Sequence, residues 1–540
     1  MNKGNAIFFL LFFVTPAINA QIRTLDDFED KTGWTLNKSD GVNLVLSTDK
    51  GYSGNAIRFD YDFTKGTGYG GIQKLFPLDL PDNYEFTFYL KAESPANNFE
   101  IKFIDSTGNN VWWVNNRSYS FPDEWTKIRI KKRHISFAWG PTADQSLKRI
   151  DRIEFTVASV VGGKGTVWID DLKFELLQPE TNSWPAPAVT ASSHMKNHSS
   201  GLMADNSDDT YWQSRKVKKQ NIVVDFRAKR EFGGLQVNWL KDKYAKSFDL
   251  LLSDDGKNWE KVYSVRSNHD DISFIRLPEA EAKYFRIDLL KANYEKGFGV
   301  AEVKFLDIKS SLTPNDFLIY TAKNSPAGNY PRYFSEQASY WTITGVNNDV
   351  KEALLNEDGM VEVDKALFSI EPMIKTGNML YNWSNVKPVQ SMGFPDSKTE
   401  FTFLPSVTWQ CADLKFVTGV TASGQANRNS VLDIGYYFEN LSDKPVDFEF
   451  YLLIRPYQVN PYYQVLNTVG GAGKIYSIKE AEGGYLVVDK KVVLPQREYD
   501  SFGACSFDEG NIVDLIRKGD LPRDKMAEDQ NGQANGILKY

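Results

Sequence analysis

Short runs in which apolar and polar residues alternate follow one another along most of this chain. Examples are AIRFDYDF at 56–63, YEFTFYLKA at 84–92 and FEIKFID at 99–105, and the stretches between such runs are rich in Gly, Asn, Asp and Pro. A period of two is typical of a strand with one buried face, and these turn-forming residues are typical of antiparallel connections. Sustained helical periodicity is nearly absent. The pattern predicts an all-β protein.

Two Pro-containing polar stretches interrupt the strand pattern. The first is LLQPETNSWPAPAVTAS and the second is LDIKSSLTPND. Because 540 residues are too many for one hydrophobic core, we read both as domain boundaries. The sequence predicts three domains, at 21–178, 186–308 and 314–540.

The N-terminal stretch MNKGNAIFFLLFFVTPAINA has one Lys, an apolar run from Ala6 to Val14 and an exit that contains Pro. The run is too short to span a membrane and is typical of a secretory signal, with cleavage after Ala20. No later apolar run approaches spanning length. We expect residues 1–20 to be a signal peptide, the protein to be secreted or periplasmic, and no insertion into a membrane.

Composition narrows the classes of partner. The net charge is −7, and no basic block with interleaved aromatics occurs, which argues against nucleic acid. The chain has 13 Trp, 26 Tyr and 35 Phe, and exposed rings without basic excess suit the flat faces of sugars. Cys411 and Cys505 could form a disulfide or remain as buried free thiols, and the sequence leaves both open.

The first domain opens with LDDFEDKTGW and closes with GTVWIDDLKFEL. Together with SGNAIRFDY and GYGG, these motifs resemble the family 11 type of jelly-roll carbohydrate-binding module, in the galactose-binding-like superfamily. The resemblance implies a β-glucan or similar ligand and a structural calcium ion near the termini, with Glu29, Asp170 and Asp171 as side-chain ligands. The alternative is that these acidic residues occupy turns that face water.

Sugar binding on such a sandwich requires exposed rings. The candidates are Tyr69, Trp112, Trp113 and Trp139. Neighbouring residues of a strand point to opposite faces, so one of Trp112 and Trp113 belongs to the core and the other lies outside. The sequence does not say which.

The second domain contains ADNSDDTYWQS, then SDDGKNW, and finally Glu302 in GFGVAE. These motifs resemble the discoidin, or coagulation-factor C-type, domain, which includes the family 32 carbohydrate-binding modules. The resemblance implies that Trp212 is a core anchor and that the acidic turn wraps a calcium ion. The side chains implied around the ion are Asp205, Asp208, Thr210 and Glu302.

In that family the ligand binds on loops at the calcium-bearing end. Here those loops would offer His194, His198, Trp239, Tyr244 and Phe298. The two histidines are four residues apart, but a zinc-protease glutamate is missing between them and no helix is expected, so we do not predict zinc.

The third domain contains YPRYFSEQASYW and RPYQVNP. It resembles the N-terminal β-sandwich that precedes an (α/α)6 barrel in some bacterial glycosidases and sugar phosphorylases. In those enzymes the barrel holds the acid and the base, so we expect a truncated, non-catalytic portion here. Four carboxylates are available, but no spacing argument brings two together, and we assign no catalytic residue; they are Glu336, Glu357, Asp358 and Asp364.

The expected fold is therefore all-β, with two galactose-binding-like jelly rolls followed by a larger antiparallel β-sandwich. The expected function is that of an exported carbohydrate-binding protein, the glycan-targeting portion of a polysaccharide-degrading enzyme whose (α/α)6 domain is missing. Two alternatives remain open. One is a complete glycoside hydrolase or phosphorylase that uses the third domain, and the other is an adhesion protein that binds partners through the discoidin domain.

Overall fold

A computed structural model describes the chain in two compact units, residues 1–183 and 184–540, which we treat separately. The boundary falls in the first predicted linker. Residues 1–21, which include the predicted signal peptide, lie outside the described residues, as do five internal stretches: 179–182, 216–217, 294–295, 394–403 and 467.

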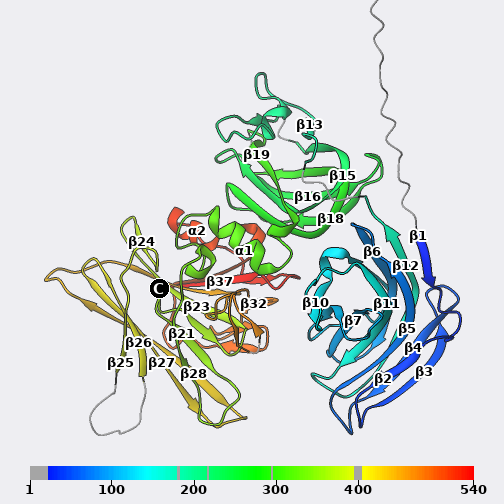
Figure 1. Ribbon diagram of the computed structural model, residues 1–540. Coiled ribbons are helices and arrows are strands. Elements are labelled where there is room, and N and C mark those ends of the chain that lie inside the picture. Colours follow the sequence, from blue (N-terminus) through cyan, green and yellow to red (C-terminus); the bar gives the residue numbers. More distant parts are fainter. Residues whose placement is uncertain (1–21, 179–182, 216–217, 294–295, 394–403, 467) are drawn as a thin grey trace, which may run out of the picture. The chain divides into compact units, whose positions relative to one another are not determined.

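The first domain, residues 22–178, is built from two antiparallel sheets (Figure 1). Its strands are β1 (Ile22–Asp26), β2 (Thr35–Lys38), β3 (Asn43–Lys50), β4 (Asn55–Asp62), β5 (Tyr69–Asp79), β6 (Tyr84–Glu93), β7 (Asn98–Ile104), β8 (Val111–Asn116), β9 (Thr126–Lys131), β10 (Ser136–Trp139), β11 (Arg149–Ala158) and β12 (Lys164–Leu176), with a 3-10 turn η1 (Lys132–His134). One sheet has the order β3-β4-β12-β6-β9, with β1 beside β12, and the other has the order β10-β8-β7-β11-β5-β2.

Alternating side chains from both sheets fill the core of this domain. On β4, for example, Ile57, Phe59 and Tyr61 are buried. Rings from the opposite sheet and the N-terminal loop meet them, and Trp34 lies 5.4 Å from Phe28 between ring centroids. The period-two pattern in the sequence thus becomes a two-layer sandwich.

The second domain, residues 188–308, has one seven-stranded antiparallel sheet. Its elements are β13 (Ala188–Ala191), β14 (Trp212–Gln213), β15 (Gln220–Trp239), β16 (Ala245–Ser253), β17 (Glu260–Val265), β18 (Ile272–Ala292) and β19 (Gly299–Leu306), with 3-10 turns η2 (Ser200–Met203) and η3 (Ile308–Ser310). Strands β15 and β18 pair along most of their length, but the register shifts between Asp225 and Arg230 and again between Phe232 and Gly234. Such irregularities bend strands, so β15 and β18 do not run straight along their full length.

The third domain, residues 314–540, opens on a helix and contains two main sheets. Its elements are α1 (Pro314–Lys323), η4 (Arg332–Ser335), β20 (Trp341–Thr344), β21 (Ala353–Asn356), β22 (Val361–Val363), β23 (Phe368–Thr376), β24 (Met379–Tyr381), β25 (Val389–Gly393), β26 (Leu404–Cys411), β27 (Leu414–Gly424), β28 (Ser430–Asn440), β29 (Glu449–Arg455), β30 (Val465–Leu466), β31 (Thr468–Val469), β32 (Ser477–Glu480), β33 (Leu486–Val488), β34 (Lys491–Val493), β35 (Ser501–Ser506), η5 (Phe507–Glu509), α2 (Ile512–Lys518), β36 (Met526–Glu528) and β37 (Ala534–Lys539).

An eight-stranded sheet of order β20-β21-β22-β23-β29-β37-β35, with β24 beside β23, contributes the larger layer of this domain. The second main sheet has the order β25-β26-β27-β28, and a smaller one has the order β34-β33-β32-β36. Apolar residues of all three sheets, among them Trp409, Phe416 and Ile454, share one hydrophobic core.

A buried ion pair lies inside the third domain. The guanidinium of Arg455 on β29 binds both carboxylate oxygens of Glu371 on the neighbouring strand β23 and also donates to the carbonyl of Asn329. Both side chains are almost inaccessible to solvent. The pair ties the sheet to the loop that precedes η4.

The second and third domains are joined by a continuous set of contacts, which we call the seam. Asp270 accepts hydrogen bonds from Lys518 Nζ at 3.0 Å and from the Asn511 backbone N–H at 3.3 Å. Beside this polar contact, Phe274 and Phe317 share an apolar cluster. The structure therefore groups residues 184–540 in one unit, although the sequence predicts a boundary near 310–314.

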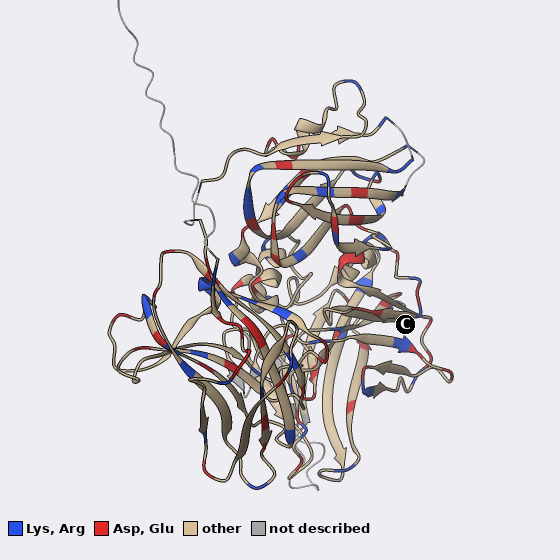
Figure 2. Cartoon of the chain, turned by 90° about the vertical axis from the view of Figure 1, so that its right-hand side faces the viewer, with Lys and Arg blue, Asp and Glu red and all other residues tan. Residues whose placement is uncertain are grey.

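The architecture confirms the all-β prediction. Only α1 and α2 are α-helical among the residues that the structure describes, and within that part of the chain no helix is both long and apolar enough to cross a membrane. Figure 2 shows acidic and basic residues interspersed along the strands. Cys411 and Cys505 are both buried free thiols, which settles the alternative that the sequence left open.

Candidate functional site

The outer face of the sheet β10-β8-β7-β11-β5-β2 in the first domain carries an aromatic pair. Strand alternation on β8 turns Trp112 into the core, where its indole N–H donates to the carbonyl of Gln145 at 2.6 Å. Trp113 points the other way and meets Trp139, with ring centroids 5.4 Å apart and ring planes nearly perpendicular at 88°. Because Trp139 is 48% exposed, a ligand can reach this pair.

Polar side chains continue from Trp113 across the same face. The antiparallel register places Trp113 opposite Lys102, Lys102 opposite Glu154, and Glu154 opposite Gln73. Lys102 Nζ lies 2.9 Å from the Glu154 carboxylate and 3.2 Å from that of Glu100. Although burial opposes it, these two carboxylates raise the pKa of Lys102, so the network is held in its charged form.

Tyr69 and Asn115 on the same face are also placed to contact a ligand. Tyr69 is partly exposed on β5, and Lys102 Nζ lies 5.3 Å from the centre of its ring. Asn115 follows Trp113 by two residues on β8 and so shares its face, and the buried side-chain oxygen of Asn115 has no hydrogen-bond partner in the described structure. The face thus combines flat rings with fixed polar groups, as a sugar ring and its hydroxyls require.

Two of the three predicted calcium ligands of the first domain meet at one turn. Asp170 accepts from the Ser53 backbone N–H at 2.9 Å, and Glu29 accepts from that of Asn55 at 3.3 Å. The other oxygen of Asp170 is buried and has no hydrogen-bond partner among the described residues, and burial raises the pKa of Asp170. Asp171, the third candidate, lies at a bulge in β12 and pairs with Lys173 instead.

The acidic turn of the second domain is folded on itself. The Asp205 carboxylate accepts from the Thr210 hydroxyl at 2.7 Å and from the Ser207 backbone N–H at 3.1 Å. Asn206 has a positive φ of 62°, which Asn tolerates better than most residues. Immediately afterwards Trp212 is fully buried, and its indole N–H donates to a backbone carbonyl, so this ring anchors the turn to the core.

Glu302 lies in the same region as the acidic turn. Its side chain is buried, one carboxylate oxygen has no partner in the described structure, and burial together with Asp205 and Asp208 raises its pKa to about 7. Asp208 has partners outside the turn, because its carboxylate accepts a hydrogen bond from Asn238 at 2.7 Å and contacts Lys304 at 3.3 Å. Among the described residues no group of three or more His, Cys, Asp or Glu is arranged to hold a metal ion by side chains alone.

Residues 188–303, which contain this turn and Glu302, match the F5/8 type C domain family. This part of the chain is thus similar to the discoidin domain, and we refer to it by that name. Its burial pattern agrees with the core-anchor role that the resemblance implied for Trp212.

Three solved structures illustrate what the chain is similar to. Chitosan-binding module 2 of a Paenibacillus sp. IK-5 chitosanase/glucanase, solved with chitotriose, is 23% identical over 22% of this chain and 96% of that one (TM-score 0.22). The family 11 carbohydrate-binding module of Clostridium thermocellum, with a β-1,3-1,4-mixed-linked tetrasaccharide, is 22% identical over 30% and 98% (TM-score 0.25). The family 32 module of C. perfringens NanJ, with galactose, is 11% identical over 22% and 93% (TM-score 0.21). No curated protein matches the chain.

The loops of the discoidin domain offer fewer rings than the sequence predicts. Trp239 and Phe298 are core residues, with 4% and no exposure, so the expectation that they contact ligand is corrected. Trp239 is the last residue of β15 and Phe298 directly precedes β19. At both places the ring packs into the core and does not face solvent. Tyr244 is half-buried against the same core.

Two predicted residues of the discoidin loops do reach the surface. His194 is exposed, and its ring Nδ1 lies 3.0 Å from the Met195 carbonyl oxygen. His198 is half-buried and stacks on Tyr211, with centroids 4.1 Å apart and planes at 15°. Tyr211 therefore joins the candidate ligand surface, although nothing in the sequence marks it beyond its position beside Trp212.

The four carboxylates that the sequence offered as candidates in the third domain are each paired with a cation. Glu336 pairs with Lys323 and Asp364 with Lys491. Glu357 and Asp358 both contact Arg332, and burial raises the pKa of Asp358 to about 6.

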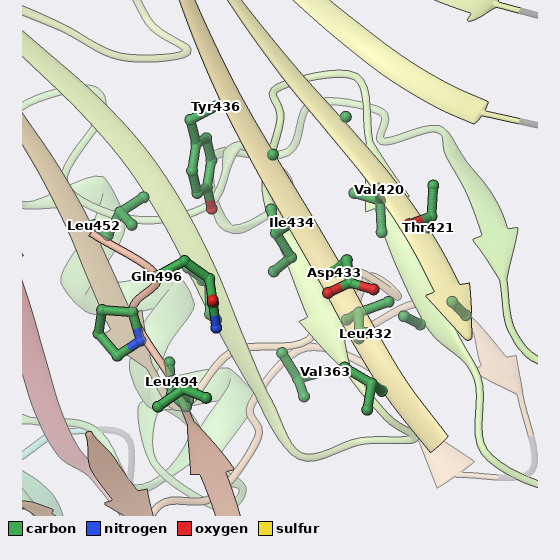
Figure 3. Close-up of a pocket in the computed structure, with 18 of the residues that line it drawn as sticks. Val363, Val420, Thr421, Leu432, Asp433, Ile434, Tyr436, Leu452, Leu494 and Gln496 are labelled. Atoms are coloured by element: carbon green, nitrogen blue, oxygen red, sulfur yellow. The ribbon is translucent and has the colours of Figure 1, made fainter. Parts of the chain in front are cut away.

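A large groove runs beside β28 in the third domain, with a volume of about 1650 Å³. Figure 3 shows Leu432, Ile434 and Tyr436 of this strand on one side, with Leu494 and Gln496 on the other. The lining is mainly apolar and aromatic, so it differs from the charged face of the first domain.

The sequence analysis missed the polar network around Lys102 and Glu154. A signal was present, since Glu100 and Lys102 occupy alternate positions of the run FEIKF and must share a face. What the sequence could not supply is the strand order, which brings β11 next to β7 and so places Glu154 beside Lys102.

Proposed function

We propose that the chain is a carbohydrate-binding protein and that the outer face of the sheet β10-β8-β7-β11-β5-β2 binds an oligo- or polysaccharide. The observation that carries the proposal is the perpendicular pair Trp113 and Trp139 beside a fixed polar row. A pyranose face stacks on a ring while its hydroxyls exchange hydrogen bonds with the accessible groups of this face, Asn115 and Tyr69. The buried pair of Lys102 and Glu154 fixes the strands beneath them. Lys102 lies between two carboxylates, so this network leaves no unpaired positive charge for an anionic sugar, which favours a glycan without acidic groups.

Calorimetric titration of the full chain with sugars of different charge and length tests this proposal. Suitable probes are the neutral β-1,3-1,4-mixed-linked tetrasaccharide and galactose, with chitotriose, which carries amino groups, as the charged comparison. We expect binding of at least one neutral chain, with loss of that binding in a Trp113→Ala, Trp139→Ala double variant. Heats that are indistinguishable in the wild type and the double variant would contradict the assignment of this face.

We further propose that calcium is a structural ion of the discoidin domain. The support is the unpartnered oxygen of Glu302 and the neighbouring carboxylate of Asp205. Carboxylate and carbonyl oxygens are the ligands that this hard cation prefers. Backbone carbonyls of the turn would complete the set. Glu29 and Asp170 are the corresponding side chains in the first domain, and Asp171 does not take part.

We infer that the protein is exported and serves as the non-catalytic, glycan-targeting portion of a polysaccharide-degrading system. The support is the N-terminal sequence pattern and the cation pairing of the third-domain carboxylates. A reducing-sugar assay over α- and β-linked polysaccharides should give no activity. Hydrolysis that is lost in Glu357→Gln or Asp358→Asn would show instead that the third domain is an enzyme.

A further inference from the structure

Strand β28 is an open edge of its sheet. Among the described strands it pairs only with β27, although it spans eleven residues from Ser430 to Asn440. Natural proteins protect long edge strands with Pro, Lys, bulges or inward-pointing charges. The sequence SVLDIGYYFEN has no Pro, Lys or Arg, and its register with β27 is unbroken. An edge of this kind is a template for another strand.

The space beside β28 is shaped to receive such a strand. The inward positions of β28 carry Leu432, Ile434 and Tyr436 (Figure 3), followed by Phe438, and all four line the groove and remain partly exposed. Side chains of β29, including Leu452, line the groove as well. A strand added to β28 would project every second side chain into this apolar space.

We propose that the strand is β28 of a second copy of this chain, paired antiparallel about a two-fold axis at Gly435. Gly435 is the midpoint of Ser430–Asn440, so this register pairs all eleven residues of both strands. Closed two-fold dimers of this kind use one surface patch twice, which requires that the patch be complementary to itself.

The register makes β28 complementary to itself on both faces. Inside, Leu432 lies opposite Phe438 and Ile434 opposite Tyr436, so apolar side chains meet apolar side chains. Outside, Asp433 lies opposite Tyr437, whose hydroxyl can donate to the carboxylate. No two like charges face each other, which matters because directly opposed like charges destabilise a strand pair.

Two further observations agree with a strand β28 that is covered by a second copy of the chain. Tyr437 is 66% exposed and Val431 is 54% exposed on the outer face, which is unusual for two apolar side chains of one edge strand. At the proposed axis Gly435 has no side chain, and the atoms nearest to the position of a Cβ there belong to the exposed ring of Tyr437. The two backbones can therefore approach to strand-pairing distance.

Sedimentation of the full chain tests the dimer. We expect a dimeric mass for the wild type and a monomeric mass for Tyr437→Asp, which places a carboxylate opposite Asp433 on both sides of the axis. Tyr340→Asp is the matched control, because Tyr340 is 67% exposed but lies away from β28, and it should remain dimeric. A monomeric wild type, or a dimer that survives Tyr437→Asp, overturns the proposal.

A disulfide provides a test of the register itself. Gly435→Cys places two thiols opposite each other across the axis, within the Cα separation of about 4.4–6.8 Å that a disulfide needs. The new Cβ would meet the Tyr437 ring at 2.9 Å, but that ring is exposed and can turn away. We expect cross-linked dimers on mild oxidation, whereas their absence overturns the register.

Thr421→Cys is the control for the cross-link. Thr421 lies on β27 opposite Asp433, so the two copies of this residue would be three strand spacings apart, roughly 14 Å, and further apart along the strand direction. Cys411 and Cys505 are buried and should not contribute to cross-linking. Cross-linking of Thr421→Cys to the same extent as Gly435→Cys contradicts the proposed pairing.

Discussion

Adjacent Trp112 and Trp113 have opposite roles, because β8 turns one into the core and the other outward. Trp113→Ala should abolish or strongly weaken glycan binding at the first domain while the melting temperature changes little. Trp112→Ala removes a buried ring and should lower the free energy of unfolding by about 3–5 kcal/mol. Calorimetric titration and thermal melting of both variants measure the two effects. Equal loss of stability in both would contradict the assignment of faces.

Glu302 provides a prediction about pH and calcium. Burial, with Asp205 and Asp208, raises its pKa from 4.5 to about 7. Between these values the folded state binds more protons than the unfolded state, so without calcium the free energy of unfolding falls as pH rises. A bound cation compensates the ionised carboxylate, and the gain in melting temperature on adding calcium should be larger at about pH 8 than at about pH 5.

Glu302→Gln is the control for this experiment, because it keeps the shape of the side chain and removes its charge. The variant should lose most of the gain in melting temperature on adding calcium. It should also lose the dependence of that gain on pH. An identical gain in melting temperature at both pH values, or in the wild type and the variant, would count against calcium at this turn.

At the residue scale the sequence could predict which side chains are candidates but not always their orientation. Alternation shows that Trp112 and Trp113 differ, yet only the packing of β8 against β7 and β10 decides which one is outside. Trp239 and Phe298 were assigned to ligand loops from their place in a resemblance. Their burial depends on contacts with Phe248 and other distant core residues, which local sequence does not reveal.

Among the elements, strands β23 and β29 are linked by the buried pair of Glu371 and Arg455. Glu371→Ala would leave the guanidinium buried and without its counter-charge, which typically costs about 3–5 kcal/mol. Chemical denaturation should show this loss. Glu439→Ala is the control, because Glu439 pairs with Lys415 at the surface and its removal should cost less than about 1 kcal/mol.

Helix α1 shows where element prediction from sequence was incomplete. Its start carries a clear signal, since the Thr313 hydroxyl caps the helix, Asp316 reaches back to the Thr313 N–H, and Pro314 occupies the first turn. The sequence analysis read this stretch as a linker because SSLTPND is polar and rich in turn-formers. Strand periodicity, by contrast, is repeated so often that the all-β class was predictable.

For the whole molecule, the seam predicts cooperative unfolding of residues 184–540. Calorimetry of the full chain should show no separate transition for the discoidin domain, because Asp270, Lys518 and the cluster of Phe274 and Phe317 couple it to the third domain. Asp270→Ala should weaken this coupling and split the transition. Asp254→Ala, which breaks an exposed pair with Lys229, should leave it unchanged. Independent transitions in the wild type would contradict the coupling.

The seam was not predictable from the sequence, since the polar, Pro-containing stretch near 310–314 has the composition of an ordinary linker. The contacts that close it come from three separate places in the chain, around residues 270, 317 and 511–518. Only the folded arrangement of the sheets brings them together.

The seam also has a mechanical consequence. A pull on a ligand held by the discoidin loops would load the interface that contains Asp270, Asn511 and Lys518 before it could separate the two domains. The apolar cluster around Phe274 would have to be exposed in the same event. Stretched by its ends in a force experiment, residues 184–540 should therefore yield first at the seam, in one abrupt rupture that precedes the unravelling of either sandwich.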